Sequence, residues 1–152
     1  MPYLRDMRRR LAIGSVALLF FWACQPDKPD PNSTTPTALQ RLTGGSSRTW
    51  RLQTLSRRGS SEPIPPCRAD DRWTFRSDNT ASLQNPTTCT INDPDDPPAF
   101  SGQWRLSNGE RFLVVEGQGF FMSREIIQLT DNILVWEYTG DGGDLIQETW
   151  VP

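Results

Sequence analysis

The 152-residue sequence contains no histidine, and this absence excludes several classes of enzyme at once. Without an imidazole there is no Ser-His-Asp or Cys-His arrangement for nucleophilic catalysis. Zinc sites built with imidazole are excluded too, and isolated cysteines do not make a zinc site. The sequence also lacks a phosphate-binding glycine loop and a nucleophile elbow. We therefore expect a protein that is not an enzyme and that needs neither a metal nor a cofactor.

Clusters of basic side chains are missing beyond the first ten residues. Residues 1–23 carry four Arg and one Asp, so the other 129 residues have 12 basic and 17 acidic side chains and a net charge near −5. A protein of this charge has no electrostatic reason to bind nucleic acid. The pair Arg57-Arg58 is isolated and is interpreted as a solvated turn. We therefore expect no nucleic-acid partner.

No apolar run is long enough to span a membrane. The longest, Leu11–Ala23, has 13 uncharged residues. At about 1.5 Å per residue it cannot cross a hydrocarbon core of roughly 30 Å. Four arginines precede it, and the small residue Ala23 ends it, which is the layout of a secretory signal. We predict that residues 1–23 form a signal peptide.

Cys24 stands directly after the predicted cleavage site, so the segment resembles a bacterial lipoprotein signal, in which that thiol is lipidated. The resemblance implies a membrane anchor at Cys24 in the bacterial cell envelope, and Gln25 in the next position implies transport to the outer membrane. An ordinary signal peptide cut elsewhere is the alternative. Residues 24–38 are Pro-rich and have no large apolar side chain, so we expect a disordered, partly stiff tether.

The three cysteines are an odd number, which is awkward in an exported protein. The count is resolved if Cys24 takes a lipid and Cys67 pairs with Cys89 in an oxidising compartment. A bond across those 22 positions contributes roughly 3 kcal/mol in the chain-entropy description. Two free buried thiols are the alternative.

From residue 48 onward apolar and polar side chains alternate, which is the period of a β-strand. The pattern predicts eight strands, over residues 48–54, 72–76, 80–84, 100–107, 111–116, 120–130, 133–139 and 144–151. Most are joined by tight turns such as Asn108-Gly109. Two longer loops, 57–66 and 86–99, interrupt the series. Eight such strands predict an all-β domain, an antiparallel up-and-down barrel without open edges.

The domain from residue 39 to 152 resembles a known family. Residues 42–52, Leu42-Thr-Gly-Gly-Ser-Ser-Arg-Thr-Trp50-Arg-Leu52, look like the opening strand of the lipocalin-like domains of exported lipoproteins in Gram-negative bacteria, of the Bacteroidota type. Similar features follow in order: Cys67 shortly before Asp71–Phe75, then Gly102–Leu106, and Ile127–Leu134 near the end. The resemblance implies a lipocalin-like barrel that binds a small hydrophobic ligand.

Large aromatic side chains fall at the inward positions of the predicted strands. They are Trp50, Trp73, Phe75, Trp104 and Trp136, and they are the candidate lining of an apolar ligand pocket. The alternative is a filled core, because side chains alone can occupy the interior of an eight-stranded barrel. In that case the protein is a structural or interaction lipoprotein that works through its two long loops. In both cases we expect a monomer.

A ligand site also needs a few polar groups that point inward. Thr54, Ser123 and Glu125 are the candidates. The other strand glutamates, Glu116, Glu137 and Glu148, are expected to face solvent. The carboxylates of Asn92–Asp96 lack the spacing of a calcium loop and are interpreted as a solvated acidic loop.

Overall fold

The computed structural model describes residues 35–87, 89, 97–117 and 119–152. The predicted signal peptide, Cys24 and the acidic loop Asn92–Asp96 lie outside the described residues. The chain from Thr34 to Pro152 forms one compact unit. Within the described ranges, no helix has the length and apolar character needed to cross a membrane.

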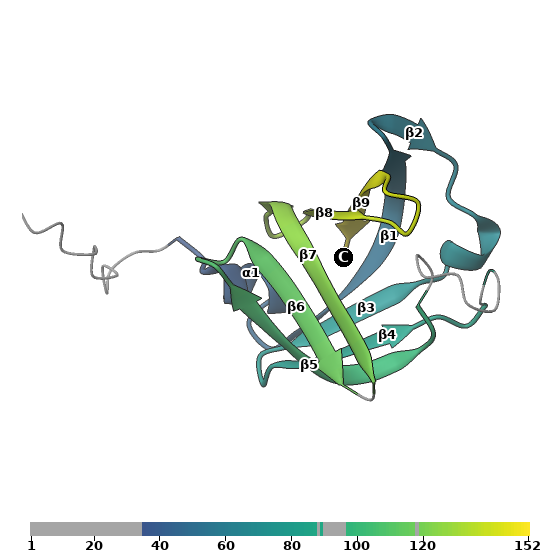
Figure 1. Cartoon of the computed structure of the whole chain (residues 1–152). Helices are drawn as coiled ribbons and strands as arrows, with labels where there is room; N and C mark the ends of the chain where they lie inside the picture. Colours follow the sequence, from purple (N-terminus) through teal and green to yellow (C-terminus); the bar gives the residue numbers. More distant parts are fainter. Residues whose placement is uncertain (1–34, 88, 90–96, 118) are drawn as a thin grey trace, which may run out of the picture. The chain divides into compact units, whose positions relative to one another are not determined.

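The described chain folds into a barrel of antiparallel strands. The strands are β1 (Ser47–Arg57), β2 (Ser60–Glu62), β3 (Arg72–Arg76), β4 (Thr80–Gln84), β5 (Phe100–Ser107), β6 (Phe112–Gly117), β7 (Phe120–Leu129), β8 (Leu134–Thr139) and β9 (Leu145–Val151). Each pairs with the next along the order β2-β1-β3-β4-β5-β6-β7-β8-β9, and β1 also pairs with β9 (Figure 1). All strands except β2 therefore close into a ring, which confirms the predicted eight-stranded barrel.

The ninth strand, β2, corrects the prediction of a loop over residues 57–66. Arg58 and Gly59 have φ angles of 52° and 76°, the left-handed geometry of a two-residue hairpin turn. That turn folds Ser60–Glu62 back onto the end of β1, with Arg57 opposite Ser60. The Arg58 side chain donates to Asp144 at 2.6 Å. The arginine pair thus lies at an exposed turn, as predicted, and this turn belongs to a hairpin tied to the β8–β9 loop.

The polar residues expected to face inward on β1 and β7 do not. Between Leu52 and Thr54 the register of β1 against β9 shifts by one residue, and this bulge turns Leu55 inward in place of Thr54. On β7 the buried residue is Met122, so its neighbour Ser123 faces outward. Glu125 lies on the same outer face and pairs with Arg111 at 2.7 Å.

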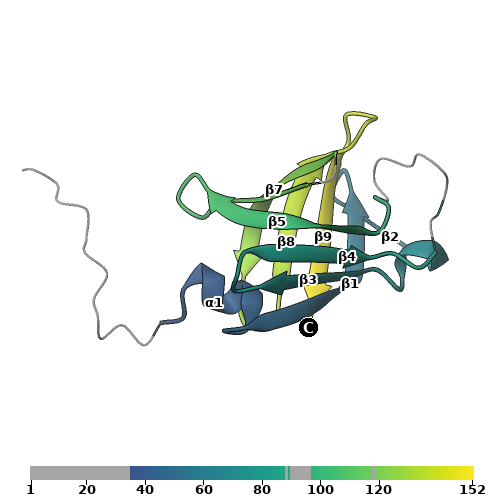
Figure 2. The same cartoon turned by 90° about the horizontal axis from the view of Figure 1, so that it is seen from below.

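One end of the barrel is covered by the helix α1 (Ala38–Thr43) (Figure 2). Thr37 and Gln40 form a reciprocal capping box that starts the helix. Leu42 is fully buried, and its carbonyl accepts the indole N–H of Trp50 at 2.9 Å. This end is therefore closed. The opposite end, where β3 and β5 begin and β4 and β8 end, we call the barrel mouth.

Candidate functional site

The predicted aromatic residues pack against one another through the middle of the barrel. Trp50, Trp73, Phe75, Trp104 and Trp136 are each 3% exposed or less, which confirms their predicted burial. The rings of Trp73 on β3 and Trp136 on β8 meet edge to face, with centroids 6.3 Å apart. Because β3 and β8 are not neighbours in the sheet, this contact reaches across the interior. Aromatic rings therefore fill the middle of the barrel, and the role of these residues as a ligand lining stays a prediction.

Open space remains at the barrel mouth. A cavity of about 150 Å³ there is lined by Pro97, Phe120, Phe121, Met122, Arg124, Tyr138, Thr139, Gly140 and Asp141. A larger hollow of about 450 Å³ lies mainly on the outer wall of β3, β4 and β5. It is lined by the outward residues Arg76, Ser82, Gln84 and Ser101, together with Leu83, Ala99 and Phe100. Ligand pockets typically start near 300 Å³. The mouth cavity thus suits a small group or one end of a ligand.

A buried carboxylate, Glu148 on β9, organises the interior beside this cavity. Its Oε2 accepts the indole N–H groups of Trp136 at 2.8 Å and Trp150 at 3.2 Å. Its Oε1 accepts the hydroxyl of Tyr138 at 3.0 Å and Nη1 of Arg68 at 2.9 Å. A carboxylate offers about four acceptor positions, so all of them are used here.

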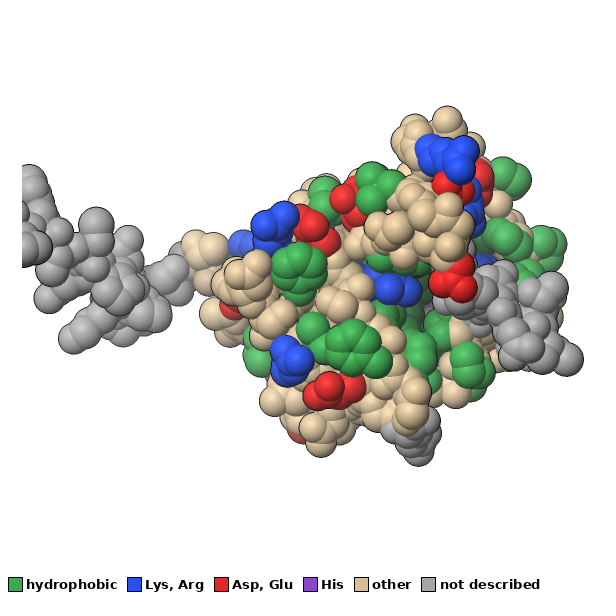
Figure 3. Space-filling model, viewed as in Figure 1, with side chains coloured by type: hydrophobic (Ala, Val, Ile, Leu, Met, Phe, Trp, Pro, Cys, Tyr) green, Lys and Arg blue, Asp and Glu red, His purple; other side chains and the backbone are tan. Residues whose placement is uncertain are grey.

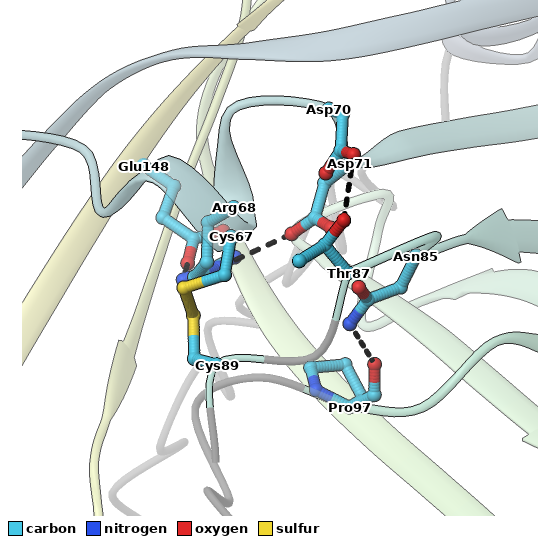
Figure 4. The surroundings of a disulfide bond; sticks show 9 residues. All are labelled: Cys67, Arg68, Asp70, Asp71, Asn85, Thr87, Cys89, Pro97 and Glu148. Atoms are coloured by element: carbon cyan, nitrogen blue, oxygen red, sulfur yellow. Dashed lines mark hydrogen bonds and ion pairs between the residues drawn. A yellow bond between two sulfur atoms is a disulfide. The ribbon is translucent and has the colours of Figure 1, made fainter.

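Arg68 reaches this carboxylate from outside the sheet. It ends the short 3₁₀ helix η1 (Pro66–Arg68), and its side chain is only 7% exposed. Its Nε donates to Asp71 at 3.2 Å, so the guanidinium lies between two carboxylates (Figure 4). Burial alone would lower the pKa of Arg68, but the charge of Glu148, with Tyr138 and Asp71, raises it above its usual value. Arg68 therefore stays charged.

A second arginine extends this polar array along the wall of the mouth. Arg124 on β7 lies opposite the buried Leu113, which places it on the inner face, and its guanidinium carbon is 3.6 Å from the ring centroid of Tyr138. From β7 to η1 the polar array consists of Arg124, Tyr138, Glu148 and Arg68. Its two ends are cationic, and a phenol and a carboxylate lie between them. Figure 3 shows a hollow on the face viewed, with a basic side chain inside it and apolar side chains along its wall.

The disulfide Cys67–Cys89 confirms the predicted pairing, with Cα atoms 5.0 Å apart. It joins η1 to the long loop between β4 and β5 directly beside Arg68 (Figure 4). One hydrogen bond crosses the same junction, because Thr87 donates to Asp70 at 3.3 Å. A second joins the two ends of the β4–β5 loop, because Asn85 donates to the carbonyl of Pro97 at 2.9 Å. The bond therefore fixes the segment that inserts Arg68 into the barrel.

Removing this bond is expected to loosen the barrel mouth. The double variant Cys67→Ser with Cys89→Ser should lose roughly 3 kcal/mol of free energy of unfolding, because its unfolded chain regains the entropy of a 22-residue loop. Urea melts of the wild type with and without reductant, beside melts of the variant, measure the loss. Reductant should shift the wild type to the stability of the variant and leave the variant unchanged. Equal melts for all four samples would contradict the expectation.

The central residue of the site, Glu148, was expected to face solvent, and that prediction is wrong. It is 2% exposed because two indoles, a phenol and a guanidinium replace its hydration. Ile146, Glu148 and Trp150 alternate on β9, and both flanking residues are fully buried. A charged residue placed between two large apolar ones at strand period was the available signal. Arg68, from a short 3₁₀ turn, had none.

No group of metal-binding side chains is found among the residues that the structure describes. The site instead offers charged side chains that form hydrogen bonds, at a barrel mouth lined by aromatic residues.

The model of the lipocalin-like domain family matches residues 42–136, which is more than half of the chain. The chain therefore belongs to the lipocalin-like domain family. No curated protein matches the sequence. The matched range ends at Trp136, so β9 and its residue Glu148 lie beyond it.

Proposed function

We propose that this protein is an exported, lipid-anchored binding module that holds a small, largely apolar ligand at the barrel mouth. The observation that carries the proposal is the difference between the two halves of the interior. Aromatic rings fill the middle of the barrel, whereas the mouth keeps a cavity of about 150 Å³ with polar groups in its wall.

The lining of the mouth cavity matches what ligand sites require. Phe120 and Met122 on β7 give it an apolar wall. Arg124 on the same strand and Tyr138 on β8 supply polar groups. Ligand sites combine such apolar surface with a few placed polar groups that fix orientation. A ligand with an apolar body and one polar group fits this arrangement better than a fully apolar one does.

Blocking the cavity tests the proposal. The dye 8-anilinonaphthalene-1-sulfonate, which has an apolar body and one anionic group, should gain fluorescence with the wild type. Met122 borders the cavity and its side chain faces inward on β7, so Met122→Trp should remove most of the gain by filling part of the space. Gln103→Trp adds the same ring at an exposed position of β5 and should leave binding intact. Equal dye binding by all three proteins would refute a mouth site.

Protein interaction through the mouth loops is a second candidate function. Its support is the exposure of two large apolar residues at this end: Phe121 is 66% exposed and Leu145 is 48% exposed. The filled middle of the barrel favours it too. Dye binding that persists in Met122→Trp but is lost in Phe121→Ser would favour this surface over the cavity.

The anchor is the part of the proposal that rests on the sequence alone. The arginine-rich start, the apolar run and Ala23-Cys24 support lipidation of Cys24 and attachment to the outer membrane. Acyl chains hold a protein to a membrane in proportion to the hydrocarbon that they bury. Nothing in the described barrel suggests chemistry on a substrate, so we propose no enzymatic activity.

Cys24→Ser is expected to move the protein from the membrane to the soluble fraction of fractionated cells. The reason is that the substituted residue cannot take the lipid, and no other part of the proposal supplies an anchor. Immunoblots of the fractions measure the change, and Cys67→Ser with Cys89→Ser serves as the control because it keeps Cys24. An unchanged membrane fraction for Cys24→Ser would contradict the lipid anchor.

A further inference from the structure

The hydrogen bonds of Glu148 divide into two kinds. Three donors, Trp136, Tyr138 and Trp150, belong to the barrel wall on β8 and β9. The fourth, Arg68, is the only cation among the four and comes from η1, outside the wall. Removing Arg68 would therefore leave the three wall donors in place, with one acceptor position and the negative charge of Glu148 unsatisfied.

A second carboxylate faces the same volume. Asp71 accepts from Nε of Arg68 at 3.2 Å while Glu148 accepts from Nη1 at 2.9 Å. Both carboxylates are nearly inaccessible to solvent, at 1% and 2% exposure. Buried carboxylates of this kind bind strongly to a planar cation with several N–H donors. The space held by the Arg68 head thus has the chemistry of a guanidinium site.

The occupant of this space is attached to a segment that a covalent bond controls. Arg68 directly follows Cys67, whose disulfide to Cys89 fixes η1 to the β4–β5 loop. While the bond is intact, the guanidinium has a very high local concentration at the two carboxylates. When the bond is broken, η1 is no longer fixed to the β4–β5 loop. An added cation then competes more effectively with the Arg68 guanidinium for the two carboxylates.

We propose that Glu148 and Asp71 form a binding site for a small ligand with a guanidinium or amidinium head, and that Arg68 is its intrachain occupant, held in place by the Cys67–Cys89 bond. The inference rests on the proposed function in placing a ligand at the barrel mouth, and it adds the chemical class of the polar group. Arg124 and Tyr138 then flank the site on the side of the open cavity.

Chemical rescue tests the site that Glu148 and Asp71 form. Arg68→Ala is expected to melt about 10–20 °C below the wild type, because it leaves a buried charge without its partner. Methylguanidinium chloride at millimolar concentration should restore at least about half of that loss in a saturable manner. Sodium chloride at the same ionic strength should not, and the double variant Arg68→Ala with Glu148→Gln should not respond to methylguanidinium.

A second variant covers the case in which Arg68→Ala does not fold. Arg68→Met keeps an apolar stem of similar length, and titration with methylguanidinium should shift the indole N–H resonance of Trp136 in NMR spectra. The wild type should bind methylguanidinium at least about tenfold more tightly after reduction of the disulfide than before it. Absence of rescue and of the resonance shift, or equal binding by the reduced and oxidised wild type, would overturn the inference. If the dye still binds the wild type at the mouth, that failure leaves the proposed function standing.

Discussion

Trp104→Ala is expected to lower the free energy of unfolding by about 3–5 kcal/mol, which is the usual result of truncating a buried Trp. Trp104 is 3% exposed, and its ring meets Phe75 edge to face with centroids 6.0 Å apart. Its indole N–H also donates to the carbonyl of Arg76 at 3.0 Å, so the truncation removes this hydrogen bond as well. Thermal and urea melts measure the loss.

The control for this truncation is Phe121→Ala, which removes an aromatic ring that is 66% exposed. Exposed positions of this kind usually change stability by about 0.5 kcal/mol or less. A Trp104→Ala protein as stable as Phe121→Ala would mean that a void already exists beside Trp104. That outcome would favour a deep ligand pocket over the packed interior described here.

Glu148→Leu should be at least as damaging as the loss of Trp104. The substitution removes the acceptor of two indoles and a phenol and leaves the buried charge of Arg68 with Asp71 alone. Breaking one side of a buried ion pair typically costs about 3–5 kcal/mol. Glu148→Gln keeps one acceptor oxygen and a similar shape, and it should lose less. Urea melts of the two variants rank them.

A double-variant cycle with Arg68→Met separates the charge from the packing. If the loss in Glu148→Leu comes mainly from an isolated buried cation, it should be smaller when Arg68→Met is already present. A coupling of at least about 1 kcal/mol is expected for side chains in such direct contact. Additive losses would show that Glu148 acts through the two indoles and the phenol and that the ion pair contributes nothing.

The barrel was predictable because its strands obey simple alternation. Trp73 and Phe75 on β3, or Leu134 and Trp136 on β8, stand two residues apart and face the same side. The turn at Asn108-Gly109 also follows from a local signal. These features depend on a residue and its near neighbours, which a single sequence shows.

The polar site was not predictable in the same way, because its contacts join distant parts of the chain. Arg68 and Glu148 are 80 positions apart, and only the closed barrel brings them together. The inward position of Thr54 failed for a different reason: a one-residue bulge in β1 reverses the alternation after Leu52, and no turn residue announces it. The indole N–H groups of Trp136 and Trp150 stabilise the buried carboxylate of Glu148. The sequence does not show which acceptor an indole binds.

The most direct test of the account follows the indole N–H resonances while a ligand probe is added. The chain after residue 23 has five tryptophans: Trp50, Trp73, Trp104, Trp136 and Trp150. On titration with the anilinonaphthalene dye, the resonances of Trp136 and Trp150 should shift, because both indoles bind Glu148 beside the mouth. Those of Trp50 and Trp104, whose partners lie toward the closed end, should stay in place. Shifts confined to Trp50 and Trp104 would contradict a filled barrel with its ligand at the mouth.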